Sequence, residues 1–397
     1  MPLPNYTPCI DANADELIIK YFDQGYAYEV IKEFLRCRHN VLISLSTIER
    51  RLRKYECLKR PLIARRSSIQ DLTRAIEDQL SGSGSVLGYR KIHANITANG
   101  LIAKKDDVRL ILKQLDPNGV EARRKKRLRR RRFFSPGPNH CWCIDGHDKL
   151  KPYGFSIHGC ICAFSRRILW LEVSSSNKLP EVIAEYYLNT VSQLKCIPHK
   201  ITADDGTEHA LIQPMQIYLR SLNGDGNELD SFSIIPSPRN QRIEAYWSHL
   251  RRDRPAWWQI FFDAIESQGL FDGNDPALVD CIRFCFMHLL REELNDVAIK
   301  WNQHAISESR RNTGPTGKPD CMYFLPHLYD ADDYAKMVDM HEVEELKTVT
   351  GLPPDVSPEF KEFAEIIMSE NNMTIPDNIN DALNLYYFLH SEIINNS

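Results

Sequence analysis

The strongest constraint on the fold of this chain is a change in hydrophobic patterning near residue 139. Before that position, apolar residues recur every three or four positions, which is the spacing of amphipathic helices. After it, short β-rich stretches alternate with helical stretches. Because connecting helices pack back onto the faces of a sheet, this alternation predicts an α/β domain on a mixed sheet.

The α/β region is predicted to contain five strands. They cover residues 140–145, 155–162, 167–173, 199–204 and 231–236. Helices over residues 180–194 and 210–220 separate the later strands, and Asn240 can cap a further helix. Residues 256–302 are predicted to be largely helical and contain many aromatic side chains.

Charge is distributed unevenly along the chain. Residues 1–140 contain 28 Lys and Arg against 15 Asp and Glu, whereas residues 330–397 contain 3 against 15. Residues 141–329 contain 19 against 23, so the formal net charge of −3 conceals a strong asymmetry. The basic first part predicts contact with a polyanion, and the acidic last part does not.

Residues 15–56 predict three short helices, with Gly25 at the end of the first and Ser46 at the start of the third. On the third helix, Ile48 and Leu52 can face inward while four basic residues face outward. These are Arg50, Arg51, Arg53 and Lys54. A basic third helix is typical of a helix-turn-helix unit that enters the DNA major groove. A small helical bundle with a solvated basic face is the alternative.

A second helical unit over residues 88–116 follows a Ser-Gly linker at residues 81–85. Next comes a run of nine cations in ten residues. They are Arg123, Arg124, Lys125, Lys126, Arg127, Arg129, Arg130, Arg131 and Arg132. Such a run repels itself, so it is predicted to contact the DNA phosphate backbone, to direct import into the nucleus, or both. A solvated linker is the alternative.

Three carboxylates lie where strands end or a helix begins. Asp145 ends the first strand, Asp204 ends the fourth, and Glu244 lies one turn inside the helix after Asn240. If the two strands are neighbours, the three side chains come together; for any one of them, an ordinary surface acid is the alternative. Like charges within ~4–6 Å raise one another's pKa, so such a cluster is stabilised by cations. Hard oxygen ligands suit Mg²⁺ or Mn²⁺.

Four stretches of this region resemble the integrase core of retroviral integrases and insertion-sequence transposases, and most closely that of eukaryotic mobile elements. They read CWCIDGHDKLKPYGFSIHG (141–159), FSRRILWLEV (164–173), ADDGTEHALIQ (203–213) and PSPRNQRIEAYWSHLRR (236–252). Residues 88–116 resemble the helical segment that precedes the core in insertion-sequence transposases. The resemblance implies a ribonuclease-H-like mixed five-stranded sheet flanked by helices.

The resemblance also implies a function. Asp145, Asp204 and Glu244 would hold two Mg²⁺ (or Mn²⁺) ions and catalyse DNA strand cleavage and strand transfer at mobile-element ends. Double-stranded DNA would be the partner and the protein a homo-oligomer. Arg251 and Arg252, beyond Glu244 on the same helix, are candidates for contact with the DNA strand. A domesticated, catalytically silent DNA- or chromatin-binding protein is the alternative.

Two departures from the family pattern bear on catalytic competence. Cys162 stands where relatives often carry Asp, and Asp205 adds a negative charge beside the second acid. Zinc is an alternative for the pairs Cys141/Cys143 and Cys160/Cys162, although alternate cysteines on buried strands are typical of small hydrophobic side chains.

The predicted organisation has five parts. They are a helix-turn-helix unit (1–62), a linker with a second helical unit (63–120), a basic arm (121–138), the integrase-like core (139–325) and an acidic helical tail (326–397). The tail has enough apolar residues for a small helical appendage, which either contacts a protein partner or presents a solvated face. No apolar run reaches membrane-spanning length and no signal-peptide layout is present, so neither a membrane nor disulfides are expected.

Overall fold

The computed structural model describes residues 13–55, 67–82, 84, 87–122, 135–224, 226, 228–250, 254–308 and 314–396. At its centre lies a five-stranded mixed sheet with the strand order β3-β2-β1-β5-β6. The strands are β1 (Cys141–His147), β2 (Ser156–Cys162), β3 (Ile168–Ser174), β5 (Lys200–Ala203) and β6 (Phe232–Ile234). The first three are antiparallel, and β5 and β6 run parallel to β1. The predicted mixed sheet is therefore confirmed.

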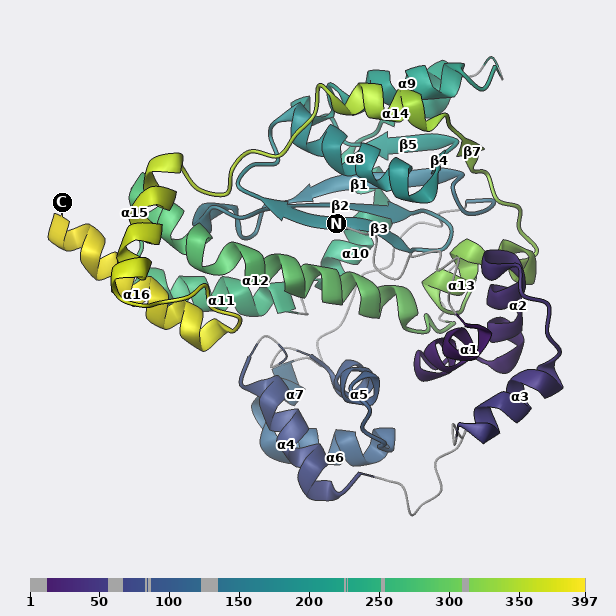
Figure 1. The fold of residues 1–397 in the computed structure, drawn as a ribbon, viewed down its shortest axis with the longest axis horizontal. Coiled ribbons are helices and arrows are strands. Elements are labelled where there is room, and N and C mark those ends of the chain that lie inside the picture. The colour runs from purple at the N-terminus through teal and green to yellow at the C-terminus, as the bar shows by residue number, and fades with distance from the viewer. Residues whose placement is uncertain are drawn as a thin grey trace.

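Helices cover both faces of this sheet (Figure 1). On one face lie α8 (Pro180–Leu194), α9 (Ile212–Ser221) and α14 (Met340–Lys347); on the other lie α10 (Gln241–Leu250), α11 (Arg254–Ser267) and α12 (Pro276–Gln303). Side chains of β1 alternate between the two layers, as a pleated strand requires. Trp142 and Ile144 belong to the layer that contains α8, whereas Cys143 belongs to the layer that contains α10 and α12.

The same alternation decides the role of the strand cysteines. Cys141 and Cys143 are buried in the layer that contains α10 and α12, whereas Cys160 and Cys162 are buried in the layer that contains α8 and α9. The sheet therefore separates the two pairs, and the four thiols do not meet at one ion. They serve as small hydrophobic side chains.

The acidic C-terminal segment is part of the core and not a small appendage, which corrects the interpretation from sequence. Helices α15 (Pro358–Glu370) and α16 (Ile379–Asn396) pack on α12, and β7 (Lys336–Met337) pairs with β4 (Cys196–Ile197). Leu385 and Tyr386 are fully buried, and the Tyr386 hydroxyl donates to the Leu270 carbonyl at 2.7 Å. Arg291 of α12 forms a two-pronged ion pair with Asp355.

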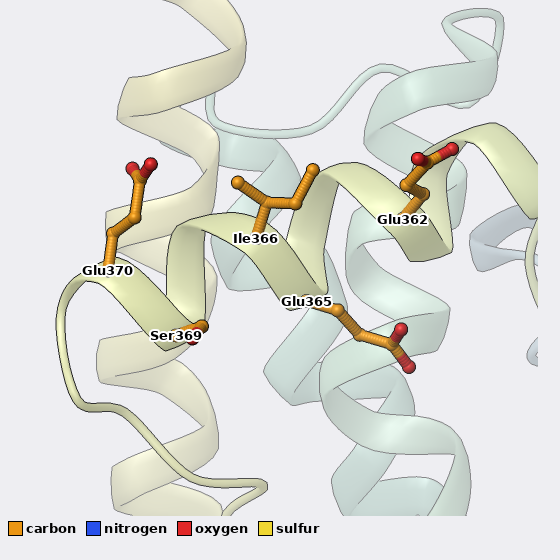
Figure 2. Close-up of a pocket in the computed structure, with 5 residues that line it drawn as sticks. All are labelled: Glu362, Glu365, Ile366, Ser369 and Glu370. Carbon is orange, nitrogen blue, oxygen red and sulfur yellow. The ribbon is translucent and has the colours of Figure 1, made fainter.

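A shallow surface pocket of about 350 Å³ lies on α15. Figure 2 shows Glu362, Ile366 and Glu370 on one side of this helix, with Glu365 and Ser369 turned away from them. The residues that line the pocket are mostly acidic and all belong to α15. The pocket is therefore separate from the three carboxylates of the sheet.

The N-terminal helices are α1 (Ala14–Asp23), α2 (Tyr28–His39) and α3 (Leu45–Lys54). Gly25, with a φ of 72°, follows α1 as predicted. The side chain of Ser44, and not that of Ser46, accepts from the Thr47 amide, so α3 begins two residues earlier than predicted. The three helices share a hydrophobic cluster with Cys321 and Leu325, which belong to the segment after α12.

That segment contains α13 (Pro319–Phe324) and the short helix η7 (Pro326–Tyr329). It connects the N-terminal helices to the sheet through a buried ion pair between Arg167 Nε and Asp320 Oδ1, at 2.8 Å. The Tyr26 hydroxyl donates to the other oxygen of Asp320 at 3.3 Å. The N-terminal helices are thereby fixed against the central domain.

Helices α4 (Ile69–Leu80), α5 (Tyr89–Ala98) and α6 (Lys105–Leu115) form a second unit with a hydrophobic cluster of its own, and α7 (Pro117–Ala122) follows it. Its buried residues include Leu72, Ile92 and Leu112. Among the helices that the structure describes, none combines the length and apolar character needed to cross a membrane.

Leu385→Ala should destabilise the whole central domain, because it removes a buried side chain between α16 and α12. We expect the free energy of unfolding in urea to fall by about 2–5 kcal/mol. Leu352→Ala, at a residue that is 51% exposed in the same C-terminal segment, is the matched control and should change it by less than ~0.5 kcal/mol. Equal effects of the two substitutions would mean that the segment is not part of the core.

Candidate active site

Parallel pairing of β1 and β5 brings two of the predicted acids together. Cys143 of β1 lies opposite Thr202 of β5. Continuing this register by two residues places Asp145 beside Asp204, and the period of two keeps both side chains on the α10 face of the sheet. Asp145 and Asp204 are both partly buried.

Helix α10 brings the third acid to the same place. Before the helix begins, the side-chain amide of Asn240 donates to the carbonyl of Ile144 at 2.9 Å, which fixes the start of α10 on β1. Glu244 lies one turn later, and its Oε1 accepts a hydrogen bond from Ser237 Oγ at 2.5 Å. Ser237 belongs to the short helix η6 (Ser237–Arg239), so the loop before α10 also orients the carboxylate.

The electrostatics of Asp145 show that the three acids share one site. Burial, together with the negative charges of Asp204 and Glu244, raises the pKa of Asp145 to about 7. Hydrogen bonds from Trp247 and from the Gly146 amide act in the opposite direction, because they favour the ionised carboxylate. The carboxyl group of Asp145 is therefore held close to its protonation midpoint at neutral pH, by its burial first and by its anionic neighbours second.

Trp247 has a role that sequence reasoning missed. Its Nε1 donates to Asp145 Oδ2 at 2.7 Å, and its ring stacks on that of His147 at 5.0 Å. Gly159 lies opposite Asp145 on β2, where an added Cβ would come within 2.6 Å of the Trp247 ring. The absence of a side chain at residue 159 thus allows Trp247 to reach Asp145. The i,i+3 spacing of Glu244 and Trp247 on one helix is the signal that could have identified it.

The two departures from the family pattern lie in different places relative to the carboxylate cluster. Asp205 is exposed, whereas Asp204 is partly buried beside Asp145, which supports Asp204 as the second acid of the cluster. Cys162 is fully buried on the opposite face of the sheet, and burial raises the pKa of its thiol.

Two further side chains with metal-ligand atoms lie beside Asp204, and sequence reasoning missed them as well. In the short helix η4 (Thr207–His209), Glu208 and His209 bring ligand atoms within 4.8 Å of one another and of Asp204. Burial lowers the pKa of His209, which keeps the ring neutral and able to coordinate a cation. Neither Asp145 nor Glu244 belongs to a group this compact among the described residues.

The donor set fits a divalent cation. Three carboxylates converge on one end of the sheet, and Asp204 Oδ1 is buried without a hydrogen-bond partner among the described residues. An uncompensated carboxylate oxygen in a buried position is stabilised when a cation coordinates it. Oxygen-rich sites of this kind suit Mg²⁺ or Mn²⁺.

The predicted DNA-contacting residues of α3 have different surroundings. Arg50 is exposed, whereas Arg51 forms an ion pair with Asp15 of α1 at 2.7 Å. Arg53 pairs with Glu49 on the same helix at 3.0 Å, and the ammonium group of Lys54 lies 5.3 Å from the centre of the Tyr55 ring. The remaining candidates lie outside the described residues: Arg123, Arg124, Lys125, Lys126, Arg127, Arg129, Arg130, Arg131, Arg132, Arg251 and Arg252.

Comparison with protein families agrees with this geometry. Residues 133–318 match the family model of the integrase core domain. Residues 133–318 are thus similar to an integrase core domain. The match includes all five strands of the central sheet and the three converging acids. Comparison with curated proteins gave no match.

Asp145→Asn should stabilise the metal-free protein at pH 8. The native pKa of Asp145 is about 7, above its usual 3.8, so the stabilising effect of the protonated form is complete below pH 4 and is lost as pH rises through 7. Asparagine cannot ionise and still accepts from Trp247. In excess chelator, we expect a gain of roughly 1–3 kcal/mol at pH 8, measured by urea unfolding, and little gain at pH 4.

Asp205→Asn is the control for this measurement, because it removes an exposed carboxylate next to Asp204. It should leave the pH dependence of stability as it is in the unmodified protein. A loss of stability at pH 8 in Asp145→Asn would contradict the electrostatic description of the site.

Proposed function

We propose that this chain catalyses metal-dependent cleavage of DNA strands and their transfer into target DNA. The observation that carries the proposal is the position of Asp145 between two further acids, Asp204 and Glu244, at the end of an integrase-core sheet. A cluster of acids on adjacent strands and on a helix is the arrangement needed to hold cations against a phosphodiester.

In this proposal, Asp145, Asp204 and Glu244 would hold two Mg²⁺ or Mn²⁺ ions. When bound, such ions activate the attacking oxygen and stabilise the leaving oxygen. The chain's own contribution is to hold the ligands in position. Trp247 orients Asp145 and Ser237 orients Glu244, as supporting hydrogen bonds commonly do at metal sites.

Double-stranded DNA is the proposed substrate and partner, bound in the nucleus by a homo-oligomer. Exposed Arg50 on α3 and the basic run over residues 123–132 would neutralise phosphates, which supplies affinity that does not depend on base sequence. A protein partner at the acidic C-terminal segment remains a proposal, supported by the net charge of residues 330–397.

Asp145→Asn should lower strand transfer on oligonucleotide element ends by on the order of 100-fold or more in Mg²⁺ or Mn²⁺, because it removes a charged ligand. The affinity for DNA, measured by anisotropy, should change little. Asp205→Asn is the matched control, since it makes the same chemical change one residue away from Asp204 and should retain activity.

The outcomes separate the proposal from its alternative. Strand transfer that survives in Asp145→Asn would disprove the role of this carboxylate. DNA binding without strand transfer in the unmodified protein, in either metal, would instead support a catalytically silent DNA-binding protein.

Arg50→Ala should weaken DNA binding and reduce the slope of log K against log salt by about 1, because one phosphate contact is lost. Arg51→Ala is the comparison on the same helix. Since Arg51 holds α3 to Asp15 of α1, its loss should lower stability by roughly 1 kcal/mol. If Arg50→Ala left the salt slope unchanged, α3 would not be the DNA-contacting helix.

A further inference from the structure

We propose that Glu33, Cys37 and His327 form a Zn²⁺ site that fastens the N-terminal helices α1–α3 to the integrase core. One ligand atom of each residue lies within 4.8 Å of one ligand atom of each of the others. This group is separate from the carboxylate cluster of the sheet, so the proposal does not depend on the catalytic function.

The three residues come from two distant segments. Glu33 and Cys37 are four residues apart on α2, and such residues are neighbours on one helix face. His327 belongs to η7, which the N-terminal helices contact directly. The Lys318 ammonium donates to the Gln24 carbonyl at 2.7 Å, so the segment that leads to His327 is held against the N-terminal helices independently of any metal.

The donor types favour zinc. A thiolate, an imidazole and a carboxylate are the three side-chain donors that Zn²⁺ uses, and three protein ligands with a water complete a tetrahedral site. Ligand atoms around a tetrahedral zinc lie ~3.3–3.7 Å apart, given bond lengths of about 2.0–2.3 Å. His327 Nε2 and Glu33 Oε2 are already 3.3 Å apart. Rotation of the exposed Cys37 side chain can supply the remaining approach.

The charges nearby are compatible with such an ion. Arg36 and His327 both approach the same oxygen of Glu33, so this carboxylate oxygen already lies where cationic groups gather. Arg36 contacts Oε2 of Glu33 at 2.7 Å, and its side chain is 48% exposed. An exposed salt bridge is weak compared with metal coordination, so Arg36 can turn into solvent when the ion binds.

Coordination at this site would link α2 to η7 through the metal ion, in addition to the contacts that already join the two parts. The hydrophobic cluster and the hydrogen bonds already hold the two parts together, and a bound ion would oppose their separation. The site would therefore control how firmly the candidate DNA-contacting helix α3 is held relative to the carboxylate cluster.

The test uses the full-length Asp145→Asn chain, in which the candidate catalytic site is weakened as a competing metal site. Titration with Co²⁺ alone should give a thiolate-to-metal charge-transfer band that saturates at one equivalent, and Zn²⁺ should displace it. Cys37→Ser should abolish the band, and His327→Gln should weaken Co²⁺ binding by about 10–100-fold. Both side chains are exposed, so these variants should fold.

Matched controls identify the site. His341→Gln removes an exposed histidine that lies 3.5 Å from Glu345 on α14 and belongs to no potential metal-binding group among the described residues, and should leave the titration unchanged. Cys9→Ser and Cys57→Ser should retain the band. A band that persists in Cys37→Ser, or that is insensitive to His327→Gln, would overturn the site.

A second measurement tests the fastening itself. In the Asp145→Asn chain, Zn²⁺ should slow amide hydrogen exchange in α1–α3 by several-fold. The same chain with Cys37→Ser added should show no such effect of Zn²⁺. Metal binding at Cys37 without slower exchange in these helices would show that the ion does not hold the two parts together.

Discussion

The parallel pairing of β1 with β5 is the interaction on which the rest of the site depends. It places Asp145 and Asp204 at neighbouring positions on one face of the sheet. The Asn240 hydrogen bond to Ile144 then attaches α10 to the same strand, and Glu244 follows one turn later. Each later element is therefore positioned relative to β1, so that a shift of one residue in this register would turn Asp204 to the opposite face.

The cluster has an electrostatic cost that the surrounding structure partly offsets. Burial and two neighbouring acids favour protonation of Asp145, whereas the Trp247 indole favours its ionised form. Bringing the Trp247 ring to Asp145 requires a glycine at residue 159. The sheet thus supports an arrangement of acids that costs stability, which is a common compromise between stability and function.

The central domain is also not independent of the segments around it. Helix α16 covers an apolar face of α12, and α13 connects the core to the N-terminal helices through Arg167 and Asp320. A buried ion pair of this kind is costly to break, because either partner alone would be an unpaired charge in the interior. The position of α3 relative to the carboxylate cluster is therefore determined by packing and not by a free linker.

The sequence alone determined the order of the main strands and helices and the whole of α8, because these depend on local periodicity and capping. It also indicated the three acids through their local positions and the family resemblance, although β1 continues two residues past Asp145 and does not end there as predicted. Local patterns could not show that the acidic tail contributes Leu385 to the core. Nor could they show that Arg51 forms an ion pair with Asp15, or that Trp247 donates a hydrogen bond to Asp145. Each of these depends on contacts between segments far apart in the chain. Only the packed tertiary structure decides which of many chemically suitable partners a side chain meets.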